Sequence, residues 1–185
     1  NHYVDRRYND AMSAEHLETY LERLDPSHLY FTVSDVAEFE RYSTRLDDLG
    51  RQGELSPAFD IFERYEERAS ERLEHVISKM GDIVASLDFD KDEYIDSDPT
   101  ERAWAVDKAE LNDRWRKRIK NQVLGLKLAE KPLEEIAPTL VKRYENQQNR
   151  LSQYNEQDVF AVYANALTSQ FDPHTSYFSP RRAEN

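Results

Sequence analysis

Residues 56–87, SPAFDIFERYEERASERLEHVISKMGDIVASL, decide the fold, because they predict one unusually long helix. Ser56 is a suitable N-cap and Pro57 suits the first helical position. Apolar side chains then recur at helical spacing: Phe59, Phe62, Tyr65, Ala69, Leu73, Val76, Met80, Val84 and Leu87. A helix of about 30 residues is about 45 Å long. Such an apolar stripe needs partner helices along its whole length, which favours a helical fold.

Two further helices are expected before this stretch. The first takes Ser13 as a plausible N-cap and stops at Asp25-Pro26, because a residue that precedes proline avoids helical angles. The second begins near Ser34, and Gly50 is its natural terminator.

Three helices are expected after it. Residues 88–99, DFDKDEYIDSDP, break the apolar pattern and predict a loop. Asp107 and Glu110 have the spacing of a capping box and open the next helix. Another helix covers residues 132–154, and Pro138 is expected to kink it or to mark its true start.

The last helix is capped by Asn155 and ended by Asp172-Pro173. No segment makes a convincing strand. The sequence therefore predicts an all-α fold, an irregular bundle of about six helices that includes one or more long ones.

Composition excludes several classes of function. The formal net charge is −12, so phosphates are repelled over most of the surface and we expect no nucleic-acid partner. The absence of cysteine excludes disulfides, zinc–thiolate sites and thiol catalysis. The sequence has no apolar run long enough for a transmembrane segment and no visible signal peptide. It begins NHYVDRRY, without methionine, and we interpret it as a segment of a longer protein.

The basic run RWRKRIK, residues 114–120, is the strongest exception to this acidity. On a helix its charges spread around much of the circumference, while Trp115 and Ile119 share one face that is expected to be buried. A salt-bridged helix surface, or a contact with a partner domain, is favoured over phosphate binding.

A calcium site is a second candidate, in the acidic loop. Asp88, Asp90 and Asp92 alternate as in the start of an EF-hand loop. Glu93, however, occupies the position of the turn glycine, and Pro99 that of the bidentate glutamate. A solvated acidic loop is therefore favoured, and we expect neither a metal nor another cofactor.

The segment FDPHTSYFSP, residues 171–180, invites a catalytic interpretation, because an aspartate, a histidine and a serine follow one another closely. Catalytic triads are assembled from distant segments, and the chain has no recognisable nucleophile–base motif, so we expect no catalytic residue. We interpret the segment as a structural junction with aromatic anchors, in which His174 makes a structural hydrogen bond. The junction residues are Asp172, Pro173, His174, Tyr177, Phe178 and Pro180. The similar segment LDPSHLYFT, residues 24–32, is expected to be anchored through Tyr30 and Phe31.

Several segments resemble the N-terminal helical region of the long tail-specific proteases, the carboxy-terminal processing peptidases of bacteria. They are LDPSHLYFTVSDVAEFE (24–40), LNDRWRKRIKNQVLGLK (111–127), KRYENQ (142–147) and VFAVYANALTSQFDPHTSYFSP (159–180). The resemblance covers nearly the whole chain, with the motifs in the family's order.

The resemblance implies a periplasmic serine–lysine endopeptidase in which a PDZ domain recognises C-terminal tails. None of the family's catalytic residues can be placed on this sequence. Residues 1–171 are then expected to be a helical accessory domain, and residues 172–185 a junction toward a PDZ and protease region. The implied partners are those domains of the same chain, together with protein substrates or an adaptor. The alternative is a free-standing helical interaction module that shares only the fold.

Overall fold

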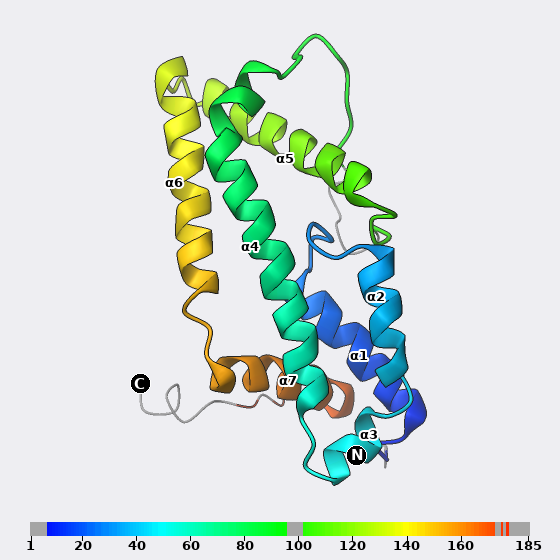
Figure 1. Ribbon diagram of the computed structural model, residues 1–185. Coiled ribbons are helices and arrows are strands. Elements are labelled where there is room, and N and C mark those ends of the chain that lie inside the picture. Colours follow the sequence, from blue (N-terminus) through cyan, green and yellow to red (C-terminus); the bar gives the residue numbers. More distant parts are fainter. Residues whose placement is uncertain (1–6, 96–101, 173–174, 176, 178–185) are drawn as a thin grey trace. The chain divides into compact units, whose positions relative to one another are not determined.

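The computed structural model describes residues 7–95, 102–172, 175 and 177, and this part of the chain is all-α (Figure 1). Thr32 and Ala105 form a single parallel backbone bridge, and the described residues contain no strand. The predicted fold class is therefore confirmed. The helices are α1 (Asp10–Leu24), α2 (Val33–Phe39), the 3₁₀ helix η1 (Glu40–Tyr42), α3 (Leu46–Arg51), α4 (Ser56–Ala85), α5 (Lys108–Leu128), α6 (Leu133–Leu151) and α7 (Glu156–Phe171).

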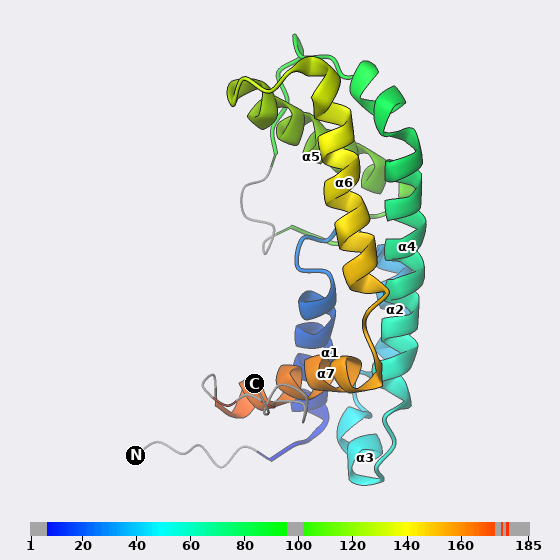
Figure 2. The ribbon, with the colours of Figure 1, turned by 90° about the vertical axis from the view of Figure 1, so that its left-hand side faces the viewer.

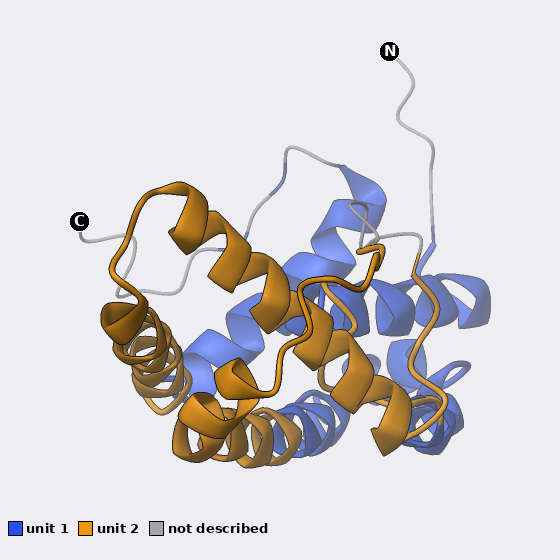
Figure 3. Ribbon diagram, turned by 90° about the horizontal axis from the view of Figure 1, so that it is seen from above, with its two compact units in different colours: residues 1–26, 34–65, 154–185 blue, residues 27–33, 66–153 orange. Residues whose placement is uncertain are grey.

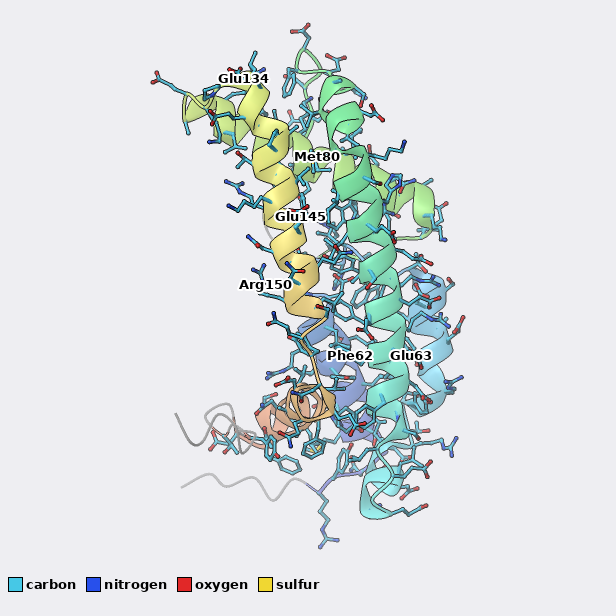
Figure 4. The ribbon with its side chains drawn as sticks, turned by 60° about the vertical axis from the view of Figure 1, so that its left-hand side comes forward. Phe62, Glu63, Met80, Glu134, Glu145 and Arg150 are labelled. Atoms are coloured by element: carbon cyan, nitrogen blue, oxygen red, sulfur yellow. The ribbon has the colours of Figure 1, made fainter. Side chains whose placement is uncertain are left out.

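The long helix predicted from the apolar stripe is α4, which has 30 residues. The stripe is buried over most of its length, at Phe62, Ala69, Leu73, Val76 and Met80. Figure 4 labels Phe62 and Met80 together with Glu63, an exposed residue beside the stripe. The helical period thus separates the buried positions from the solvated ones, as the sequence indicated.

The prediction of a single helix from Ser34 to Gly50 is wrong. The chain forms three short pieces there, α2, η1 and α3, and the N-cap of α3, Arg45, has φ −128°. The tighter 3₁₀ turn still leaves Phe39, Tyr42, Leu46 and Leu49 buried, so their spacing gave no sign of the break. Gly50 lies inside α3, and the left-handed position after the helix belongs to Gly53, at φ +73°.

Helix α1 begins earlier than predicted. Its N-cap is Asn9, whose side chain accepts a hydrogen bond of 3.1 Å from the Met12 amide. Ser13 is instead buried inside the helix, where its hydroxyl contacts Asp47. The predicted end of the helix is confirmed, because Asp25 is the C-cap.

The predicted caps of α5 and α7 are confirmed. The Asp107 side chain accepts a 2.9 Å hydrogen bond from the Glu110 amide, while the Glu110 carboxylate accepts one of 2.8 Å from the Val106 amide. Asn155 and Asp158 form a complete capping box at the start of α7.

Pro138 lies inside α6 and is not its start. The helix begins five residues earlier, at Leu133. The whole first turn therefore precedes the proline, which is the sixth helical residue and has no N–H to donate to the Glu134 carbonyl.

The chain divides into two compact units (Figure 3). Unit 1 contains residues 1–26, 34–65 and 154–185, and within it α1 packs against α7 and α3 (Figures 1 and 2). Unit 2 contains residues 27–33 and 66–153, and within it α5 packs against α6. Helix α4 supplies its first ten residues to unit 1 and the others to unit 2.

Candidate functional site

The junction after α7 is described at three of its residues. Asp172 is the C-cap of α7 and its amide donates to the Thr168 carbonyl at 3.1 Å. The Thr175 amide in turn donates to the Asp172 carbonyl at 3.0 Å. Pro173, His174, Phe178 and Pro180, which the sequence assigned to the same junction, lie outside the described residues.

Tyr177 is attached to α7 by a two-way contact with one side chain. The Asn165 amide group accepts from the Tyr177 backbone N–H at 2.6 Å and donates to the Tyr177 carbonyl at 3.0 Å. The Tyr177 ring lies edge-on to Phe160, with ring centroids 5.2 Å apart. Asn165 therefore pairs with Tyr177 as a neighbouring strand would, and this ties Tyr177 back to α7 beyond the end of the helix.

A buried polar cluster around His16 lies in unit 1. His16 is fully buried. Its Nε2 lies 2.9 Å from the Tyr163 carbonyl oxygen, and its Nδ1 lies 2.8 Å from the Tyr8 hydroxyl. A carbonyl can only accept, so Nε2 carries the proton and Nδ1 accepts from Tyr8. Burial lowers the pKa of His16 to about 4, and the ring is thus held in its neutral form.

Ser13 and Asp47, which lie in the same cluster, form hydrogen bonds with each other. Ser13 Oγ donates to Asp47 Oδ1 at 2.9 Å and accepts from the Asp47 amide at 2.9 Å. Arg51 also pairs with the Asp47 carboxylate, at 3.1 Å. Because both ring nitrogens of His16 are occupied by other groups, His16 does not serve Ser13 as a general base, and the cluster is suited to packing rather than to hydrolysis.

The corner at residues 27–33 is anchored in unit 2 by its backbone. Trp115 Nε1 donates to the Leu29 carbonyl at 2.8 Å, and the Val33 amide donates to the Ala105 carbonyl at 2.8 Å. Tyr30 and Phe31 are 7% and 0% exposed. The predicted burial of these two aromatic residues is confirmed.

The basic run of α5 forms a network of ion pairs. Arg116 and Lys120 both bind Glu93, with Lys120 Nζ 2.8 Å from Glu93 Oε2. Arg116 and Lys117 bind Asp113, at 2.7 and 2.8 Å. The two cations also hold the pKa of Glu93 well below its usual range. The predicted salt-bridged helix surface is confirmed, and Trp115 and Ile119 share its buried face.

Two comparisons with known proteins identify the family. The family model described as "Tail specific protease N-terminal domain" matches residues 1–181. A protein of Haemophilus influenzae named "Tail-specific protease" is 35% identical over all 185 residues, which is 100% of this chain and 26% of that protein. The chain belongs to the tail-specific protease N-terminal domain family. It spans about a quarter of the length of this relative.

The described part of this tail-specific protease N-terminal domain has no evident metal centre. No group of three or more potential metal-ligating residues lies close together there. In the acidic loop, the carboxylate of Glu93 is directed to Arg116 and Lys120. Each helix in the same part of the chain is too short or too polar to traverse a bilayer.

Sequence reasoning missed His16 and Asn165 in this family member. The sequence gives no sign of the contact at His16, because Tyr163, whose carbonyl accepts its hydrogen bond, is 147 residues away. Asn165 lies in the mostly apolar middle of α7, and a polar residue there was the available sign of a side-chain contact with the following segment.

Proposed function

We propose that this chain is the non-catalytic N-terminal domain of a periplasmic protease of the serine–lysine type, which recognises the C-terminal tails of its substrates. The observation that carries the proposal is that a tail-specific protease matches the whole chain while extending over almost four times its length. His16 and Ser13 are hydrogen-bonded to other groups, which supports a non-catalytic role for both residues.

In this proposal residues 1–171 form the helical accessory domain, and residues 172–185 form the junction toward the PDZ and protease domains. The pairing of Asn165 with Tyr177 supports a junction whose first described residues are held against α7. The domain then contributes to the placement of the catalytic part, and its partners are the other domains of the chain and protein substrates or an adaptor.

The test compares this chain with the intact protein from which it comes. Both are incubated with an unstructured protein that ends in an apolar tail, and fragments are followed by mass spectrometry. We expect cleavage by the intact protein and none by the chain, whose folded state is verified by circular dichroism.

Cleavage by the purified chain, lost when one of its own serines is replaced, would contradict the non-catalytic role. A parent gene without a PDZ-like region and without separated serine and lysine motifs would favour a free-standing interaction module instead.

A further inference from the structure

A groove runs along one face of α5 in unit 2. It has a volume of about 520 Å³. Its α5 wall consists of Glu110, Asp113, Arg114, Lys117, Arg118 and Asn121, which are three or four positions apart or adjacent and so form one stripe. This stripe is about 16 Å long at 1.5 Å per residue. An extended peptide of about five residues, at about 3.3 Å per residue, has the same length.

The groove is positively charged, in contrast to the chain as a whole. Among the described residues that line it, four are cationic and two are anionic, which leaves an excess of two positive charges. Arg114 binds Glu110, and Lys117 binds Asp113 at 2.8 Å. These pairs neutralise the two carboxylates among its described lining residues.

Arg118 is the cation of this stripe that has no carboxylate partner among the residues the structure describes. Its Nε is buried and has no hydrogen-bond partner there. The guanidinium lies 5.9 Å from the centroid of the Trp115 ring and next to the Tyr144 hydroxyl. Arg118 as a whole is half-buried and lines the groove, so a carboxylate there can pair with its guanidinium.

The other side of the groove combines the polar residues Ser27 and Arg102 with three apolar or aromatic ones. Leu29 is buried in its wall, whereas Tyr94 and Ile95 are 90% and 42% exposed. Exposed apolar side chains beside a cation that has no carboxylate partner among the described residues suit a ligand that presents an apolar group next to a carboxylate.

We propose that the α5 groove binds an extended acidic peptide segment of a protein partner, with Arg118 as the carboxylate contact and with Tyr94 and Ile95 against an apolar side chain. The proposal does not depend on the parent protein being a protease.

The test measures fluorescence anisotropy of a short labelled peptide with alternating glutamate and leucine, titrated with the 185-residue chain. The matched peptide carries glutamine in place of glutamate. We expect the acidic peptide to bind at least about tenfold more tightly than the glutamine peptide, and its affinity to fall when salt is raised from about 50 to about 500 mM.

Three variants assign the binding to the groove. Arg118→Gln should weaken binding about tenfold, and Tyr94→Ala, at an exposed position, about threefold. Lys108→Gln removes an equal charge from an exposed site on α5 outside the groove and should leave affinity unchanged. Thermal melting verifies that each variant is folded. If Arg118→Gln does not fold, the affinity of Tyr94→Ala decides whether the peptide binds in the groove.

Equal affinity for the two peptides, or equal losses from Arg118→Gln and Lys108→Gln, would overturn the proposal. Tighter binding of a single-stranded oligothymidylate than of the acidic peptide, lost in Arg118→Gln, would overturn the choice of a peptide as the ligand.

Discussion

Acidification should destabilise unit 1 through His16. The folded state holds this ring neutral between the Tyr8 hydroxyl and the Tyr163 carbonyl, with a pKa of about 4 against 6.5 for the free side chain. The unfolded chain therefore binds a proton that the folded chain rejects between these two pH values. The contribution of neutral His16 to stability is complete above pH 6.5 and is lost as the pH falls toward 4.

The size of the effect follows from the two pKa values. Each unit of difference corresponds to about 1.4 kcal/mol. Relative to about pH 7.5, His16 should reduce the free energy of unfolding by about 2 kcal/mol at about pH 5 and by about 3 kcal/mol at about pH 4. Protonated Nδ1 would also have to face the Tyr8 hydroxyl, which must then turn its own proton away.

Urea denaturation of the wild type and of His16→Gln over this pH range isolates the effect. Glutamine offers one donor and one acceptor and does not titrate, so the variant should be less stable at neutral pH. The stability difference between the two proteins should then shrink by about 2 kcal/mol by about pH 5. His75→Gln, at an exposed site, serves as the control and should parallel the wild type. A difference between the wild type and His16→Gln that stays constant with pH would refute the reasoning.

Three substitutions test the packing and the caps by thermal or urea denaturation. Trp115→Phe should cost about 1 kcal/mol, because it removes the hydrogen bond from the indole N–H to the Leu29 carbonyl, and no loss would show that this bond is dispensable. Asn155→Ala should cost about 1 kcal/mol by removing the capping box of α7, and full stability would contradict the role of the cap. Phe31→Ala should cost about 3–5 kcal/mol, because the side chain is fully buried. Val33→Ala, at an exposed position, should cost far less. Similar losses in the two variants would contradict the burial of the corner at residues 27–33.

The parts of the fold that the sequence predicted are those set by local chemistry. Helix α4 followed from a stripe of apolar side chains at helical spacing, and the ends of α1 and α7 followed from Asp-Pro pairs. The capping side chains Asp107 and Asn155 likewise act on amides within three residues of themselves. Such short-range preferences can be predicted from a few neighbouring residues, without knowledge of the rest of the fold.

The errors arose where distant contacts override local preference. Ser13 has the chemistry of an N-cap, but Asp47, 34 residues away, binds its hydroxyl inside the helix. The break between α2 and α3 leaves the apolar spacing intact, and for that reason the sequence pattern did not reveal it. The partners of His16 and Arg118 likewise depend on which segments the fold brings together.

The most direct test of the account is the turnover number of the intact parent protein with Asn165→Ala. This substitution removes both hydrogen bonds that attach Tyr177 to α7 and touches no proposed catalytic group. Asn149→Ala, at an exposed site on α6, is the matched control. If the domain places the catalytic part through this junction, Asn165→Ala should lower turnover several-fold, about 1 kcal/mol in activation free energy, while Asn149→Ala leaves it unchanged and both variants stay folded. Turnover by folded Asn165→Ala equal to that of the wild type would contradict the account.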